Sequence, residues 1–231
     1  MARPPAIETE TGLWLAFDVS SLRLTDDQLL RFFRDNDEFQ FELSAKGELI
    51  VMSPATPKTD ERNVTIITSL RIWTKQDGTG RSFGNNAMFT LPNGARRCPD
   101  SSWIPNRRWE RFTEEEKDSL TRICPDFVIE LRSISDRIRN VQEKLEEYIS
   151  NGSKLGWLLD PIDNCVYIYR PMRRHSVSTV PESSAAIRYF RGSSSISRKS
   201  SDRSTCSLAA AGGPVEHDRD GVGSGSDAGR A

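Results

Sequence analysis

The stretch ICPDFVIELRS, residues 123–133, decides the fold of the chain. Side chains on a β-strand point alternately to its two faces. One face therefore carries only apolar groups, at Phe127, Ile129 and Leu131. The other face carries mostly ionisable groups, at Asp126, Val128, Glu130 and Arg132. The pattern predicts a strand with one face in the core and a second face that presents charged side chains.

A helix and two strands are predicted after this strand. Apolar residues recur at helical spacing over 135–150, with a Ser cap at the start and the sequence NGS at the end. LGWLLDP (155–161) and VYIYRP (166–171) are typical of two closing strands.

Further helices and strands are predicted before it. TDDQLLRFFRDN, from Thr25, has a threonine cap and a short apolar face, which indicates a helix. FQFEL (39–43) and ELIVM (48–52) flank a glycine-containing turn, as in a β-hairpin. A helix over about 60–76 and a strand over 97–104 follow, and the charged stretch NRRWERFTEEEKDS is most simply a surface helix or loop.

The order of these elements predicts an α/β or α+β sheet with helices packed on it. We expect a weakly structured lead over residues 1–20 and the folded domain over 21–171. Residues 172–231 hold fourteen serines and no periodic apolar pattern, which predicts a disordered tail.

Composition restricts the classes of function. The formal net charge of the 231 residues is −1, so any contact with nucleic acid must come from a local patch. The N-terminus has no signal-peptide pattern and no apolar run approaches the roughly 20 residues of a membrane helix, so we expect a cytoplasmic protein. The four cysteines form no C-x-x-C pair, which gives no sign of a zinc site or a disulfide framework.

Histidine is absent from the first 170 residues and occurs only at His175 and His217. Ser/His/Asp and Cys/His catalysis and H-E-x-x-H zinc chemistry all require an imidazole. If the predicted domain is an enzyme, carboxylates, lysines and arginines must carry its chemistry.

The tripeptide Cys-Pro-Asp occurs at 98–100 and again at 124–126, each time before a strand. Two adjacent strands can place Asp100 and Glu130 side by side at one edge of a sheet. Paired carboxylates are hard oxygen ligands for Mg²⁺ or Mn²⁺, which can assist phosphodiester hydrolysis without histidine. A cation such as Arg132, or a lysine of the next helix, would orient water or offset charge in the transition state.

The chain resembles the Uma2 family, also called DUF820, whose members are restriction-endonuclease-like proteins. The resemblance covers about residues 22–170 and is carried by FELSAKGELIVMSP, RCPDSSWI, CPDFVIELRSISD, VQEKLEEYISNG and LGWLLDP. It implies the PD-(D/E)xK fold, which is an α/β fold with a mixed β-sheet flanked by helices. It also implies a divalent metal ion (Mg²⁺ or Mn²⁺) and a DNA substrate. Many nucleases of this fold cut duplexes as dimers, which raises the expectation of a homodimer.

Carried over residue by residue, Asp100 matches the "PD" aspartate and Glu130 the "(D/E)", and both are the expected metal ligands. The lysine position falls on Arg132, a departure, because arginine stays protonated and cannot act as a base. Lys144, in the following helix, could supply an amine from another backbone position. Glu42 matches an acidic position of the family and is a candidate third metal ligand.

Each of these residues also has a plain structural explanation. Asp100 can be a turn residue after proline. Glu130 can form a structural ion pair, and Arg132 and Lys144 can be structural or solvated cations. Three functions therefore compete: a metal-dependent DNA endonuclease, a catalytically decayed nuclease fold that binds nucleic acid or another partner, and a protein-interaction domain with no nucleic-acid role.

The tail contains AIRYFRGSSSIS (186–197), where members of the resembled family end in an apolar segment such as DPVLPGFVLDL. One choice of codons for residues 187–197, preceded by a G, reads DPVLPGFVLDL in a neighbouring frame. We predict that a frameshift near residues 172–186 produced this tail. Sequencing the gene checks it, and codons that restore no apolar segment in another frame would contradict it.

Overall fold

The computed structural model describes residues 7–9, 12–52, 54–172 and 175–179. The chain divides into the units Met1–Arg198 and Lys199–Ala231, and every described residue belongs to the first. The expected tail lies almost wholly outside the described residues. Among those described, residues 176–179 form strand β12 (Ser176–Thr179), so ordered structure continues past the predicted boundary at 171.

The central sheet carries the strand predicted from residues 123–133. Its described strands lie in the order β12-β11-β10-β9-β8-β5. The other five strands are β5 (Gly80–Gly84), β8 (Ser101–Pro105), β9 (Phe127–Leu131), β10 (Leu155–Asp160) and β11 (Cys165–Tyr169). β9 and β10 run parallel, whereas the other neighbouring pairs are antiparallel. The sheet is therefore mixed, as predicted.

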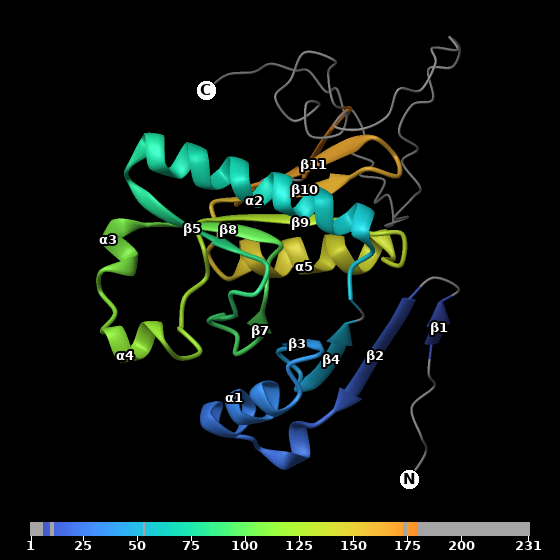
Figure 1. The fold of residues 1–231 in the computed structure, drawn as a ribbon, viewed down its shortest axis with the longest axis vertical. Coiled ribbons are helices and arrows are strands. Elements are labelled where there is room, and N and C mark those ends of the chain that lie inside the picture. Colours follow the sequence, from blue (N-terminus) through green and yellow to red (C-terminus); the bar gives the residue numbers. More distant parts are fainter. Residues whose placement is uncertain (1–6, 10–11, 53, 173–174, 180–231) are drawn as a thin grey trace, which may run out of the picture. The chain divides into compact units, whose positions relative to one another are not determined.

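Two helices cover opposite faces of the central sheet, α2 (Pro57–Asp77) and α5 (Ile138–Ser150) (Figure 1). α2 begins three residues before the expected start because Thr56 caps it and Pro57 suits the first helical position. Gly78 ends it in the left-handed conformation, at φ 69°.

α5 begins at Ile138 and not at the expected Ser135. The Asp136 carboxylate accepts hydrogen bonds from the Ser133 amide and hydroxyl, at 2.7 Å each. The Ser135 hydroxyl lies 2.8 Å from the Ser133 hydroxyl. These short-range bonds hold residues 133–136 in a turn, and Ser135 does not cap the helix.

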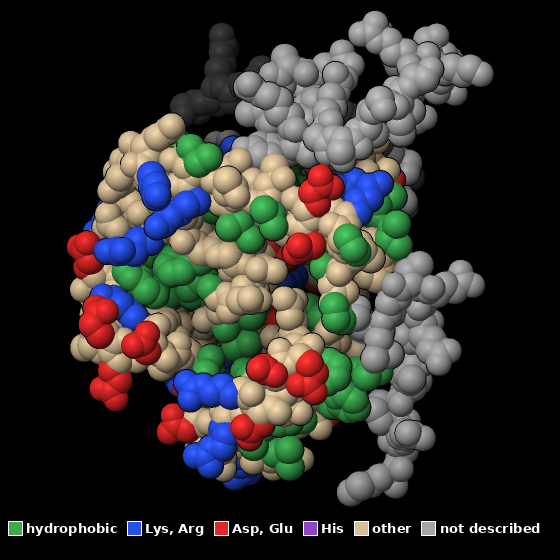
Figure 2. Space-filling view, viewed as in Figure 1, with side chains coloured by type: hydrophobic (Ala, Val, Ile, Leu, Met, Phe, Trp, Pro, Cys, Tyr) green, Lys and Arg blue, Asp and Glu red, His purple; other side chains and the backbone are tan. Residues whose placement is uncertain are grey.

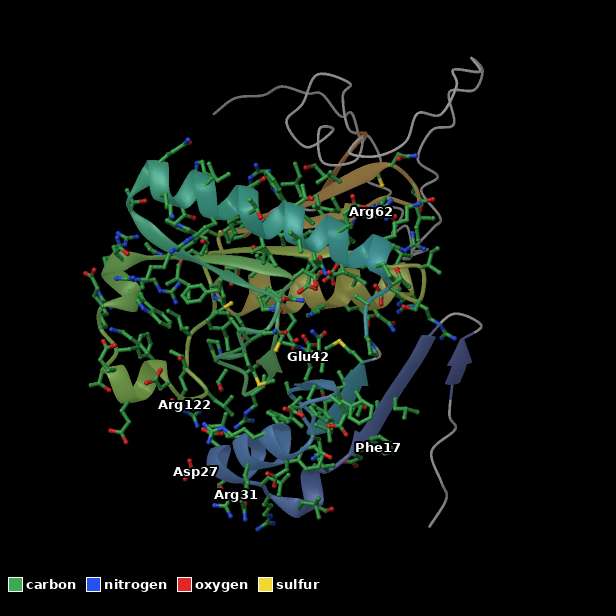
Figure 3. All side chains as sticks on the ribbon, viewed as in Figure 1. Phe17, Asp27, Arg31, Glu42, Arg62 and Arg122 are labelled. Carbon is green, nitrogen blue, oxygen red and sulfur yellow. The ribbon has the colours of Figure 1, made fainter. Side chains whose placement is uncertain are left out.

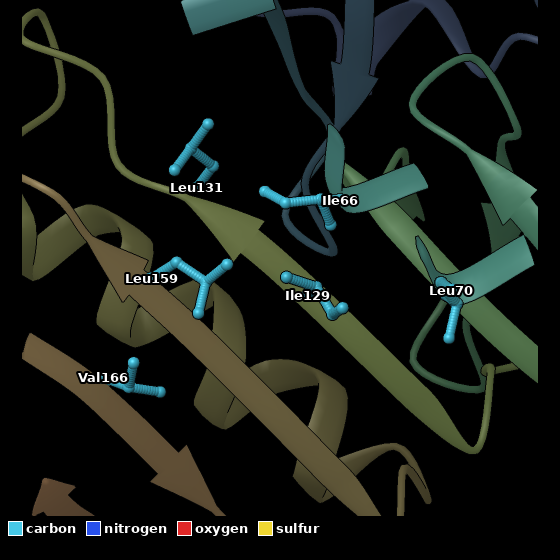
Figure 4. Packing of buried hydrophobic residues seen from close by; sticks show 6 residues of the cluster. All are labelled: Ile66, Leu70, Ile129, Leu131, Leu159 and Val166. Carbon is cyan, nitrogen blue, oxygen red and sulfur yellow. The ribbon is translucent and has the colours of Figure 1, made fainter. Parts of the chain in front are cut away.

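The alternation predicted for β9 is confirmed on its apolar face. Ile129 and Leu131 pack against Ile66 and Leu70 of α2 (Figure 4). The second face is also buried: Val128 is 0% exposed and Glu130 is 5% exposed. The reason is α5, which covers this face. A carboxylate held in such a place requires polar or charged partners.

The N-terminal sheet packs its core around α1 (Asp26–Asp35), which Thr25 caps as predicted. Its described strands lie in the order β1-β2-β4-β3-β7-β6. They are β1 (Ile7–Thr9), β2 (Gly12–Asp18), β3 (Gln40–Leu43), β4 (Glu48–Met52), β6 (Phe89–Thr90) and β7 (Arg96–Arg97). β3 and β4 form the predicted hairpin, with Gly47 at φ 83° in the turn. β1 and β2 lie within the expected lead over residues 1–20, and β2 pairs with β4 over five residues, so tertiary pairing fixes its conformation.

The strand expected over 97–104 is divided between the two sheets. Arg96 and Arg97 form β7 of the N-terminal sheet, whereas Ser101–Pro105 forms β8 of the central sheet. Pro99 between them has no N–H group to donate to a strand ladder. The segment Cys98–Asp100 is therefore the crossing from one sheet to the other.

The charged stretch after β8 forms two short helices, α3 (Asn106–Trp109) and α4 (Glu114–Lys117), and the 3₁₀ turn Ser20–Leu22 precedes α1. None of the helices in the described part of the chain is long and apolar enough to cross a membrane.

Two substitutions on α2 test the core. Leu70 is 7% exposed and Ile72 is 52% exposed. We expect Leu70→Ala to lower the free energy of unfolding by about 2–5 kcal/mol, because the deletion leaves a cavity. Ile72→Ala, the matched control, should change it by about 0.5 kcal/mol or less. Urea unfolding measures both, and equal losses would contradict the placement of Leu70 in the core.

Candidate active site

Asp100 and Glu130 lie opposite each other at one edge of the central sheet. β8 and β9 pair Ser101 with Ile129, so the next position in register places Asp100 across from Glu130. The Leu131 amide donates a 2.7 Å hydrogen bond to Asp100 Oδ2. The two carboxylates thus meet as the sequence predicted, with Asp100 part-exposed and Glu130 buried.

Lys144 brings an ammonium group from α5 to this edge. Its Nζ lies 2.9 and 3.0 Å from the two carboxylate oxygens of Glu130 and 2.7 Å from Glu42 Oε1. It also donates a 3.2 Å hydrogen bond to the Cys98 carbonyl. Lys144 therefore joins the N-terminal sheet, the crossing segment and the central sheet at one point.

Glu42 reaches the cluster from β3 and is 3% exposed. Besides Lys144, its Oε1 accepts a 2.9 Å hydrogen bond from the Cys98 amide. Its Oε2 accepts a 2.9 Å hydrogen bond from Arg97 Nη1. Glu42 is labelled in Figure 3, and Figure 2 shows a hollow on the face in view that contains acidic and basic side chains. Both oxygens of Glu42 are thus engaged by protein donors.

Arg132 does not join this cluster. Its Nη1 lies 2.7 Å from Asp160 Oδ2 and 3.0 Å from Asp163 Oδ2, so it ties the end of β9 to the turn after β10. The residue at the lysine position of the family pattern is thereby engaged in structural ion pairs. Of the two cations that the sequence offered, Lys144 is the one that the fold brings to the carboxylates.

Burial raises the pKa of both strand carboxyls. The pKa of Asp100 rises from 3.8 to about 6, although Lys144 and the Leu131 amide oppose the shift. The pKa of Glu130 rises from 4.5 to about 8, because burial and the neighbouring charges of Asp100 and Glu42 outweigh Lys144. Both groups therefore hold protons at a higher pH than free carboxyls do.

The pKa values of Lys144 and Glu42 shift in the direction that favours their charged forms. Burial alone would lower the pKa of Lys144, but Glu130, Glu42 and Asp100 raise it above the usual range, so the side chain stays an ammonium. Burial alone would raise the pKa of Glu42, but Lys144 and Arg97 hold it below its usual range. The three carboxylates therefore favour the ammonium form of Lys144.

The donor set suits a hard divalent cation bound by few protein ligands. Among the described residues, no group of three or more His, Cys, Asp or Glu side chains stands ready to hold a metal. Mg²⁺, however, commonly uses only one or two carboxylates and completes its coordination with water and phosphate. Glu130 Oε1 is buried and accepts no well-aligned hydrogen bond from the described residues, although Lys144 Nζ lies 2.9 Å from it, and Asp100 is bonded to the Leu131 amide through Oδ2. Asp100 and Glu130 therefore fit such an ion.

The family model of Uma2, described as "Putative restriction endonuclease", matches residues 26–194. The chain belongs to the Uma2 family. The match includes every element that contributes to the cluster, from β3 to α5, and confirms the resemblance that the sequence motifs carry.

A solved structure shares the fold of this Uma2 protein. It is the crystal structure of a "putative nuclease belonging to DUF820" from Anabaena variabilis ATCC 29413, with a TM-score of 0.57 and 23% identity. The superposition covers 69% of this chain and 87% of that one. None of the curated proteins matches the chain. The restriction-endonuclease-like α/β fold predicted from the sequence is thus confirmed.

Sequence reasoning missed two charged residues beside the cluster. Arg97 donates to Glu42, and its Nε also donates a 2.6 Å hydrogen bond to Glu147 Oε2. A weak signal existed for each: Arg97 directly precedes Cys-Pro-Asp, and Glu147 follows Lys144 by three residues, which places both on one face of a helix. Neither signal specifies a partner.

The raised pKa of Glu130 predicts a pH-dependent stability. Between pH 4.5 and about 8 the folded protein binds more protons at Glu130 than the unfolded chain does. The free energy of unfolding should therefore fall as pH rises through this range. In Glu130→Gln the side chain does not titrate, so we expect a shallower decline, measured by urea unfolding at several pH values. Glu143→Gln, which changes a 60% exposed side chain of α5, is the control; parallel curves for all three proteins would refute the prediction.

Proposed function

We propose that this Uma2 protein is a metal-dependent DNA endonuclease that hydrolyses phosphodiester bonds. One observation carries the proposal: Asp100 and Glu130 face each other across β8 and β9, and Lys144 contacts Glu130. Two carboxylates and one ammonium at a sheet edge provide ligands for a cation and a positive charge for phosphate. Membership of a family described as restriction endonucleases supports the same reaction class.

Asp100 and Glu130 would hold the divalent ion, Mg²⁺ or Mn²⁺. When bound, such an ion stabilises negative charge on the scissile phosphate and lowers the pKa of a coordinated water. Both carboxyls still bind protons near neutral pH, since the pKa of Glu130 is raised to about 8 and that of Asp100 to about 6. A cation and a proton therefore compete for the same oxygens.

Lys144 would act as an electrostatic group. Its ammonium is fixed by Glu130 and Glu42, both buried, and its own side chain is 15% exposed. A positive charge held in place before the reaction can stabilise the charge that develops on phosphate oxygens. In this assignment Glu42 orients Lys144, because both of its oxygens are engaged, and Arg132 has no part in the chemistry.

Cleavage of supercoiled plasmid DNA tests this proposal. We expect nicking or linearisation in Mg²⁺ or Mn²⁺ that stops with a chelator and is lost in Asp100→Asn and Glu130→Gln. Lys144→Gln should lower the rate by about 10²–10³-fold, the usual cost of removing a preorganised stabilising group. Asp126→Asn is the matched control: Asp126 also follows Cys-Pro, but it is paired with Arg108 away from the cluster.

The other outcomes separate the rival functions. DNA binding that needs no metal and leads to no cleavage would favour a decayed nuclease fold that acts as a binding module. Neither binding nor cleavage would leave a protein-interaction role. Equal losses in Asp100→Asn and Asp126→Asn would point to impaired folding and sink the assigned site.

A further inference from the structure

Arg97 connects the helix that carries Lys144 to the carboxylate that orients it. Its Nη1 lies 2.9 Å from Glu42 Oε2 and its Nε lies 2.6 Å from Glu147 Oε2. The three side chains are 12%, 3% and 17% exposed, respectively. One guanidinium therefore bridges β3 and α5 through two largely buried ion pairs.

Glu147 is itself held in place. The side chain of Asn93, in the loop before β7, donates a 2.9 Å hydrogen bond to Glu147 Oε1. The Asn93 amide donates a 2.9 Å hydrogen bond to Asn151 Oδ1, and the Asn151 side chain donates to the Glu147 carbonyl at 2.8 Å. Lys144, Glu147 and Asn151 share one face of α5, so this face is fixed against the N-terminal sheet by polar contacts at three positions.

The two carboxylate oxygens of Glu42 bind different donors, and Arg97 binds only one of them. Arg97 engages Oε2, which leaves Oε1 to Lys144 and the Cys98 amide. Lys144 is thereby shared between Glu42 and Glu130 at similar distances, 2.7 and 2.9 Å. Without Arg97, the Glu42 carboxylate could rotate and would carry one fewer cation, so it would draw Lys144 more strongly and away from Glu130.

We propose that Arg97, anchored by Glu147, is a positioning residue that sets how Lys144 is shared between Glu42 and Glu130. The inference rests on the proposed function for its catalytic consequence only. The position of Lys144 is a property of the protein without DNA or metal and can be measured separately.

Arg96 provides a matched control. It precedes Arg97 on the same strand, its side chain is 15% exposed, and it is also ion-paired, but with Asp26 of α1. Alternation along β7 sends the two arginines to opposite sides. Arg96→Gln therefore removes an ion pair of a similarly buried arginine, with an aspartate that is 32% exposed, and it leaves Glu42 untouched.

Plasmid cleavage by the full chain measures the catalytic consequence. We expect Arg97→Gln to lower the rate by about 10–100-fold, the usual effect of removing a group that orients a site residue, and Arg96→Gln to have little effect. Arg97→Lys should recover part of the loss, because one ammonium cannot hold both Glu42 and Glu147 as the guanidinium does. Glu147→Gln should lower the rate less than Arg97→Gln. Equal rates for Arg97→Gln and Arg96→Gln would overturn the proposal.

The ¹³Cε resonance of Lys144, in protein with labelled lysines and assigned by its loss in Lys144→Gln, measures the position of the ammonium directly. It should shift in Arg97→Gln and stay in place in Arg96→Gln. If the wild type cuts no DNA, the nuclease function fails, and this resonance alone decides the positioning role. An unshifted resonance in Arg97→Gln refutes it. If Arg97→Gln does not fold, the same comparison is made with Glu147→Gln.

Discussion

The ion pairs of the Lys144 ammonium with Glu42 and Glu130 are the interaction on which the arrangement of the site depends. Glu42 and Glu130 come from different sheets, and two buried carboxylates would repel each other and lose hydration without a shared cation. Lys144 offsets both costs. Its hydrogen bond to the Cys98 carbonyl also ties the segment that crosses between the sheets to the same cluster. The same contacts that allow the sheets to meet in a polar region therefore assemble the candidate site.

This dependence explains why stability and chemistry are opposed at Glu130. A carboxyl with a raised pKa prefers a proton at neutral pH, whereas the metal binding proposed for Glu130 requires the deprotonated form. The fold tolerates Glu130 because Lys144 is close, and an added divalent cation would strengthen that compensation. Apolar residues in place of this cluster would pack more simply, so the presence of these charged groups favours a functional explanation.

Local patterns in the sequence predicted much of the fold. The alternation around Ile129 and the threonine cap at Thr25 are determined by neighbours a few residues away, and both were found as predicted. Asp100 and Glu130 were also paired correctly, because strand register follows from two adjacent strands. The partners of Arg132 and Arg97 could not be predicted, since they depend on turns and sheets far apart in the chain. The strand β2 was missed for the same reason.

The crossing at Cys98–Asp100 has a consequence for how the protein folds. Glu42 lies in an early hairpin, but its donors come from residues 97, 98 and 144. Contacts between residues so distant in sequence require large loops to close first, which slows folding. During synthesis Glu42 therefore gains its last donor, Lys144, only after α5 has left the ribosome. The ion pairs that hold the cluster are completed late, although the hairpin that carries Glu42 is made early.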